Sequence, residues 1–282
     1  MKTDNAMQLK AKINNKAKEL KIPAQIMLQN YLMECFLERL SKSEYAGKFI
    51  IKGGLLIASL VGLSNRTTMD IDVTVKNIPL NENEISKIIA FVCSVPNEDD
   101  FVFYLDRVEP IRDDDEYQGF RAFLIAEYEQ LHNTLTVDVT TGDSIYPDAV
   151  MHGFSKIFDS EKISLFSYPA ETVLAEKLEI ILSRNVTTTR PRDFYDVYAL
   201  SSKSVDYKSL KTALEMTCRH RQSEKVLYQI DEIITAIRTS DILAEQWQKY
   251  TKKMPYAAEI SFEQTVNKIE ELLTIPIYEN LR

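Results

Sequence analysis

Phe49-Ile50-Ile51-Lys52-Gly53-Gly54 and Met69-Asp70-Ile71-Asp72-Val73-Thr74-Val75 are the two stretches that decide the fold of this chain. The first is a β-branched and aromatic run that ends in two glycines, which predicts a buried strand entering a turn of bare backbone. The second alternates, so its two aspartates point to one face while Ile71 and Val73 point into a core. Two carboxylates one pleat apart, beside a turn that can approach phosphates, are the parts needed to hold Mg²⁺ on a nucleoside triphosphate.

The charge pair of Asp70 and Asp72 supports this interpretation. Two like charges about 4 Å apart repel by roughly 4 kcal/mol at an effective dielectric constant near 20. A structural strand would seldom carry such a pair on one face without compensation. The alternative is that this face is solvated and lies on the outer side of the sheet. Arg66 lies just before this strand and is a candidate phosphate contact, although a plain loop explains it equally well.

Length and composition limit the class of protein. At 32.5 kDa the chain suits one large domain or two modest ones. It has no uninterrupted apolar run of about 18 residues, so we expect no transmembrane helix and no membrane partner. The first twenty residues lack the apolar core of a signal peptide. Three widely spaced cysteines and three histidines exclude a recognisable zinc site or disulfide framework, and a reducing cytoplasm is the expected location.

The net charge of −8 argues against a protein that coats long nucleic acid by charge alone. It leaves room for a local basic groove for one RNA end, or for a basic protein partner. We expect the acidic runs at residues 98–100 and 113–116 to be solvated loops. The basic groups at residues 219–221 and at lysines 249, 252 and 253 are candidates for RNA contact, although solvated helix ends explain them equally well.

The first forty residues predict two helices over Met7–Leu40 with a break near Ile22-Pro23. One apolar stripe recurs at helical spacing and predicts buried core, not a cofactor site. Its members are Tyr31, Leu32, Cys35, Phe36 and Leu40. A helix-turn-helix DNA reader is the alternative for this region, and the acidic balance disfavours it.

The middle of the chain alternates between helical and strand patterns. Helices are predicted over residues 55–61 and 81–94, and strands over residues 101–108, 120–128 and 135–140. Because the last strand alternates cleanly, Asp138 is predicted to stand beside Asp70 and Asp72 as a third carboxylate. The alternative is an ordinary solvent-facing strand residue.

After Pro169 the pattern becomes helical, so we place a domain boundary between residues 165 and 166. The predicted helices cover residues 170–184, 192–201, 207–218, 223–239, 242–251 and 262–273. Lys177 and Arg192 belong to a group of four basic residues within a short stretch of an otherwise acidic chain, and a phosphate is a good reason for that. Asp193 and Asp196 are three residues apart and therefore share one helical face. The alternatives are a surface capping arrangement for the aspartates and a surface lysine with a buried stem.

Four motifs occur in order: the Gly-Gly turn, Asp70-Ile71-Asp72, Glu176-Lys177-Leu178 and Arg192-Asp193-Phe194-Tyr195-Asp196. Together they resemble the nucleotidyltransferase AbiEii toxin family, the toxin half of type IV toxin–antitoxin and abortive-infection systems. The resemblance covers nearly the whole chain. It implies an α+β fold, with a DNA polymerase β-type nucleotidyltransferase domain over residues 1–165 and a C-terminal helical domain over residues 166–282. The first domain would be a mixed sheet with flanking helices.

The resemblance also implies roles for individual residues. Asp70, Asp72 and Asp138 would ligate Mg²⁺, with Mn²⁺ as the substitute, and Asp138 would act on the attacking hydroxyl. Lys177 would contact the triphosphate. The candidate nucleotide-binding residues are Gly53, Gly54, Arg66, Lys177, Arg192, Asp193 and Asp196. Family turns often have Ser at the second small position, so glycine here removes one hydroxyl contact.

We therefore expect a metal-dependent nucleotidyltransferase that moves a nucleoside monophosphate from an NTP to an acceptor. By resemblance the acceptor is the 3′ end of tRNA, or another RNA, and its modification would block translation. A cognate antitoxin resembling the AbiEi transcriptional regulators is the implied protein partner. Two alternatives stay open: transfer to a protein side chain, and a nucleotide-binding module that does little chemistry.

Overall fold

The computed structural model describes residues 1–111 and 119–278, with side chains described up to residue 274. The chain divides into two compact units. The first contains Met1–Asp143 and Val150–Ser167, and the second contains Ser144–Ala149 and Tyr168–Arg282. Strands and helices both contribute, and the predicted α+β fold class is confirmed.

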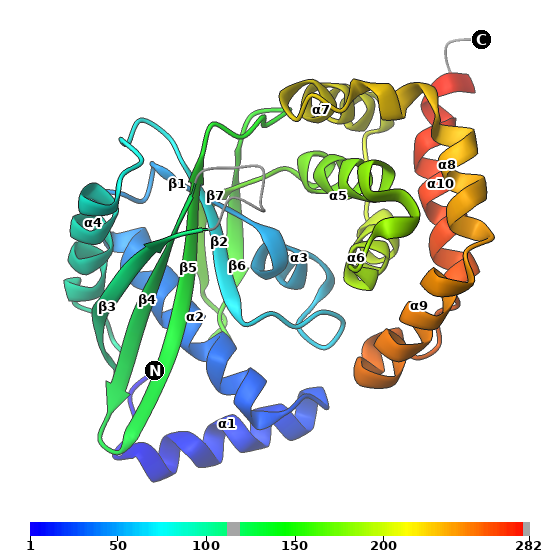
Figure 1. Ribbon diagram of the computed structural model, residues 1–282. Helices are drawn as coiled ribbons and strands as arrows, with labels where there is room; N and C mark the ends of the chain where they lie inside the picture. The colour runs from blue at the N-terminus through cyan, green and yellow to red at the C-terminus, as the bar shows by residue number, and fades with distance from the viewer. Residues whose placement is uncertain (112–118, 279–282) are drawn as a thin grey trace. The chain divides into compact units, whose positions relative to one another are not determined.

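The first unit is built on one sheet with the strand order β3-β4-β5-β2-β1-β7-β6 (Figure 1). Its strands are β1 (Phe49–Lys52), β2 (Asp70–Val75), β3 (Val102–Pro110), β4 (Gly119–Tyr128), β5 (Leu131–Thr141), β6 (Val150–Ser155) and β7 (Lys162–Ser167). The pairs β2–β5 and β1–β7 are parallel, and the other neighbouring strands are antiparallel. The sheet is therefore mixed, as predicted.

Four helices belong to this unit: α1 (Ala6–Leu20), α2 (Ala24–Lys42), α3 (Gly53–Val61) and α4 (Glu82–Ser94). Lys21 ends α1 with a φ of 55°, and Pro23 precedes α2, so the predicted break lies between the two helices. The five residues of the predicted stripe on α2 are all at most 2% exposed, which confirms that they form core. Figure 1 shows α4 beside β3 and α3 beside β2.

Alternation along β2 and β5 separates core from site. Ile71 and Val73 on β2, and Val137 and Val139 on β5, are fully buried. Burying one such side chain contributes roughly 2 kcal/mol to stability, so this face fixes the register of both strands. The polar residues between them must then point to the opposite face of the sheet.

The second unit is helical. Its helices are α5 (Ala170–Arg184), α6 (Pro191–Ser201), α7 (Tyr207–His220), α8 (Ile230–Arg238), α9 (Asp241–Lys253) and α10 (Phe262–Tyr278), with 3₁₀ turns η1 (Asn185–Thr187), η2 (Glu224–Tyr228) and η3 (Pro255–Ala257). The single helix predicted over residues 223–239 is wrong, because Gln229 has a φ of −120° and separates η2 from α8. Within residues 1–111 and 119–278, no helix has the length and apolar character needed to cross a membrane.

Two other expectations need correction. Strands β6 and β7 were not predicted: β6 buries only Phe154 and so carries no alternating pattern, whereas β7 does alternate and was overlooked. Asp99 is not solvated: it is buried and accepts hydrogen bonds from both terminal nitrogens of Arg39. The predicted loop at residues 113–116 lies outside the described residues.

Candidate functional site

The junction of β1 and α3 has no room for side chains. Gly53 has a φ of +63°, and a Cβ placed on it would lie 2.0 Å from Oδ2 of Asp72. A Cβ on Gly54 would lie 2.6 Å from Oγ1 of Thr68. The amide nitrogen of Gly54 lies 3.4 Å from Oδ2 of Asp72. At Gly53 the positive φ and the contact with Asp72 both favour glycine, whereas a side chain at Gly54 would require Thr68 to move. The two glycines bring bare backbone against a carboxylate.

The three predicted carboxylates share one face of two neighbouring strands. Asp72 on β2 lies directly beside Asp138 on β5 in a parallel register, and Asp70 lies beside Thr136. The hydroxyl of Thr68 donates a hydrogen bond of 2.8 Å to Oδ1 of Asp70. The strand alternation that buries the aliphatic residues thus gathers the acidic ones at one place.

This gathering has an electrostatic cost. The pKa of Asp72 is raised from 3.8 to about 6, mainly by burial and in addition by the charges of Asp70 and Asp138. Lys52 and the amide of Gly54 act in the opposite direction without cancelling it. The positive groups near Asp72 therefore do not compensate for its burial and for the neighbouring carboxylates. Such a perturbed pKa is typical of functional sites.

Two further residues near the glycine turn were not selected from the sequence. Lys52 stands opposite Asp72 in the β1–β2 register, and its ammonium lies 2.5 Å from Oδ2 of Asp143. Asp143 also accepts a 3.1 Å hydrogen bond from Thr140. The position of Lys52 immediately before the two glycines was the available signal.

Arg66 occupies a different place from the one expected. It is 1% exposed, and its guanidinium donates to the backbone oxygen of Thr67. Arg66 also packs within 3.3 Å of the Cβ position of Gly54. In this arrangement the side chain of Arg66 packs against the glycine turn and is too buried to contact a phosphate in solution.

Arg121 on β4 is a site residue that the sequence reasoning missed. It stands opposite Asp138 in the β4–β5 register. Its Nε lies 2.7 Å from Oδ1 of Asp138 and its Nη2 lies 2.6 Å from Oδ2. This hydrogen bonding to Asp138 raises the pKa of Arg121 above its ordinary value. Both oxygens of the third carboxylate are engaged by one guanidinium.

The family resemblance implies a magnesium ion at this site, and the donor chemistry fits. Carboxylate oxygens are the ligands that Mg²⁺ prefers, and Asp70, Asp72 and Asp138 lie on one face of adjacent strands. As the side chains stand, no three acidic, histidine or cysteine residues in the described part of the chain form a ligand set. Of the three carboxylates, Asp138 is the one whose oxygens are paired with Arg121 in this arrangement.

The second unit carries its own charged cluster. The ammonium of Lys177 on α5 lies 2.5 Å from Oδ1 of Asp193 and 3.2 Å from Oδ2 of Asp196, both on α6. Asp193 and Asp196 are 3% and 0% exposed, so the alternative of a surface capping arrangement is wrong. Oδ2 of Asp193 is buried without a hydrogen-bond partner among the described residues. The predicted Lys–Asp motif is thus one cluster of two buried aspartates and a lysine whose side chain is 19% exposed.

Two of the remaining basic candidates, Arg192 and Arg221, differ in their exposure. Arg192 is exposed at the start of α6. Arg221 is not available to RNA, because its side chain is 8% exposed and lies 2.6 Å from Glu179 and 3.4 Å from Glu176.

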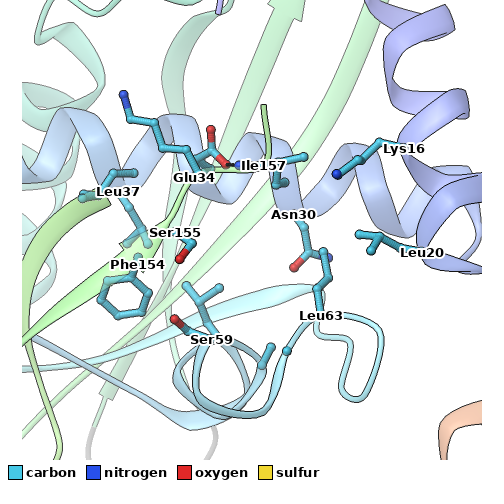
Figure 2. Close-up of a pocket in the computed structure, with 15 residues that line it drawn as sticks. Lys16, Leu20, Asn30, Glu34, Leu37, Ser59, Leu63, Phe154, Ser155 and Ile157 are labelled. Carbon is cyan, nitrogen blue, oxygen red and sulfur yellow. Dashed lines mark hydrogen bonds between the residues drawn. The ribbon is translucent and has the colours of Figure 1, made fainter. Parts of the chain in front are cut away.

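A cavity of about 320 Å³ lies elsewhere in the first unit, between α2, α3 and the end of β6 (Figure 2). None of the three site carboxylates lines it. Glu34 enters this cavity and accepts a 2.6 Å hydrogen bond from the amide of Ile157. Burial raises the pKa of Glu34 from 4.5 to about 7. The largely apolar lining, which includes Leu37 and Phe154, separates this cavity from the chemistry of the carboxylate site.

Comparison with known proteins adds a family match. A model described as nucleotidyl transferase AbiEii toxin, type IV TA system, matches residues 35–268. Among solved structures, the chain is similar to a candidate nucleotidyltransferase from H. pylori, with 14% identity, 93% of this chain and 99% of that chain covered, and a TM-score of 0.50. This similarity supports the fold.

Two further solved structures are similar to the chain. JHP933 from Helicobacter pylori has 16% identity, with 91% of this chain and 97% of that chain covered and a TM-score of 0.49. An antigenic nucleotidyltransferase-like protein from Paracoccidioides brasiliensis has 16% identity, with 75% and 93% covered and a TM-score of 0.41. No curated protein matches the sequence.

Proposed function

Because this chain belongs to the AbiEii nucleotidyl transferase toxin family of type IV toxin–antitoxin systems, we propose that it transfers a nucleoside monophosphate from an NTP to the 3′ end of an RNA. A tRNA acceptor end is the proposed substrate, since blocking it would stop translation. The proposed protein partner is a cognate antitoxin that resembles the AbiEi regulators. The chemistry of the site supports this reaction class.

One observation carries the proposal: Asp72 and Asp138 stand side by side on parallel strands, next to a glycine turn that admits no side chain. Phosphoryl and nucleotidyl transfer need positioning and charge neutralisation more than covalent chemistry. Bare backbone amides at Gly53 and Gly54 can approach a triphosphate closely. The carboxylates would hold Mg²⁺, which when bound supplies Lewis acidity and neutralises charge on the phosphates.

The side chains divide the remaining work. Asp138 would orient the attacking hydroxyl and accept its proton through a carboxylate oxygen. Lys177 would neutralise charge on the β- and γ-phosphates, a task for which a compact ammonium suffices. Asp193 and Asp196 hold that ammonium from one side, so they would fix its direction.

The test uses α-³²P-labelled NTPs, Mg²⁺ and total RNA, with wild-type protein and Asp70→Ala. Label on RNA that depends on the aspartate is the expected result. Loss of a metal-ligating carboxylate should lower the rate by at least about a hundredfold, which corresponds to roughly 3 kcal/mol of transition-state stabilisation. Asp106→Ala is the matched control, because this aspartate lies on β3, is 42% side-chain exposed and pairs with its neighbour Arg107.

The other outcomes identify the alternatives. Label on protein instead of RNA would support transfer to a side chain. Retained NTP binding without any transfer would support the binding module. RNA labelling that is equal in wild type and Asp70→Ala would contradict the proposed site.

A further inference from the structure

The contact between Arg121 and Asp138 is a bidentate charged pair at the carboxylate site. Two parallel hydrogen bonds of 2.7 and 2.6 Å join the guanidinium fork to both carboxylate oxygens. The side chain of Asp138 is 14% exposed, whereas that of Arg121 is 44% exposed. Asp138 is thus the sheltered partner, and Arg121 is the one with room to move.

Arg121 also experiences the neighbouring acids. Arg121 stands opposite Asp138 in the β4–β5 register, and Asp138 in turn stands beside Asp72 in the β2–β5 register. Residues directly opposite each other on antiparallel strands project from the same face of a sheet. Arg121 therefore projects from the face that carries the proposed metal ligands, one strand farther along the sheet.

A second arginine on this face provides a contrast. Arg107 on β3 pairs with Asp106 and Glu109, and its guanidinium lies 3.8 Å from the ring centre of Phe123. Among the contacts of Arg107 within the described residues, none is with Asp138. Arg107 is therefore a matched arginine whose removal changes the charge of the face without touching the third carboxylate.

We propose that Arg121 is an exchangeable counter-ion of Asp138 that becomes a phosphate-binding residue during the reaction. In the metal-free protein Arg121 occupies both oxygens of Asp138. It leaves them when a divalent cation occupies the carboxylates, because two cations cannot share one small acidic site without strong repulsion. The released guanidinium then binds a phosphate of the acceptor strand, since its planar fork matches phosphate as well as it matches carboxylate.

This inference rests on the proposed function for its second half and on the metal site for its first half. It assigns to one residue two effects of opposite sign. Arg121 opposes cation binding, and it favours binding of the acceptor. A purely structural role for Arg121 would weaken both or change neither.

The first experiment measures Mn²⁺ binding to the metal-free, full-length protein without nucleotide, by electron paramagnetic resonance of the free ion. Arg121→Gln should raise the affinity roughly fivefold, the gain expected from releasing one partly exposed ion pair. Arg107→Gln should leave the affinity unchanged. In the background of Asp138→Asn, Arg121→Gln should give no gain, because the residue acts through Asp138. Circular dichroism verifies that each variant is folded.

The second experiment measures binding of fluorescent tRNA with a 3′-deoxy end, in the presence of Mn²⁺ and without turnover. Arg121→Gln should weaken binding about tenfold or more, the cost of a lost charge-assisted hydrogen bond. Arg121→Lys should restore part of the affinity, because it keeps the charge but loses the fork.

The outcomes separate this inference from the proposed function. Equal or weaker Mn²⁺ binding by Arg121→Gln would overturn the exchange. Stronger Mn²⁺ binding together with unchanged tRNA binding would overturn the phosphate role. Failure of the wild-type protein to bind tRNA would count against RNA as the acceptor, while the Mn²⁺ measurement would still decide the exchange at Asp138.

Discussion

Replacing Asp72 by asparagine should stabilise the metal-free protein even though it removes a proposed catalytic residue. Asp72 is half-buried on β2, beside Asp138 and against the glycine turn. Burial and the neighbouring carboxylates raise its pKa from 3.8 to about 6. Asparagine keeps the shape and can still accept from the amide of Gly54, but it carries no charge to repel.

The size of the effect follows from the pKa. One unit corresponds to about 1.4 kcal/mol, so a shift from 3.8 to about 6 corresponds to about 3 kcal/mol. Partial exposure of Asp72 reduces this, and we expect roughly 1 to 3 kcal/mol, or several degrees in Tm. Because the folded protein binds this proton more tightly, the penalty is absent below about pH 4. It grows as the pH rises through 6 and is constant above that.

Thermal unfolding of the wild type and Asp72→Asn in EDTA, from pH 4 to pH 8, measures this difference. Asp106→Asn, on the exposed face of β3, is the control and should change Tm little at any pH. Mg²⁺ should then stabilise the wild type and not Asp72→Asn. A variant that is less stable than the wild type at pH 8, or a difference that does not change with pH, would refute the electrostatic reasoning.

Three further substitutions test other parts of the structure. Gly53→Ala should lower stability by about 1 to 2 kcal/mol and reduce nucleotidyl transfer, because its Cβ would overlap Asp72 at a positive φ; Gly47→Ala, with open space around it, should do neither in the same assays. Lys177→Met should cost about 3 kcal/mol in urea unfolding, since it leaves two buried carboxylates without their cation, and a cost below about 1 kcal/mol would contradict that pairing. Glu34→Gln should become more stable relative to the wild type as the pH rises from about 4.5 through 7, because burial raises the pKa of Glu34. A pH-independent difference in Tm for Glu34→Gln would show that the carboxyl is not perturbed in this way.

Local patterns predicted much of the first unit. Apolar residues such as Ile71 and Val139 alternate with polar ones along β2 and β5. The buried and the polar face of each strand could therefore be assigned from the sequence. The α+β class and the family resemblance are confirmed. Gly53 and Gly54 identified the turn, because only glycine suits backbone that approaches a side chain so closely.

Pairings between distant residues could not be predicted in this way. Arg121 becomes a site residue only through the β4–β5 register, which local propensity does not give. Asp99 looked like a loop carboxylate because its partner Arg39 is 60 residues away. The burial of Arg66, which is 1% exposed, likewise does not follow from its position in a predicted loop.

Ser144–Ala149 belong to the second unit, although the chain on both sides of them belongs to the first. Tyr146 in this segment exchanges hydrogen bonds of 3.0 and 2.7 Å with the buried hydroxyl of Thr172. The polypeptide therefore passes between the units three times. A protease that cuts within the segment would separate residues 1–143 covalently from β6 and β7, and these two strands would stay joined to the second unit at residue 167. A gene fragment that ends at Ser167 would contain all seven strands, but its residues 144–149 would have lost their partners in the second unit.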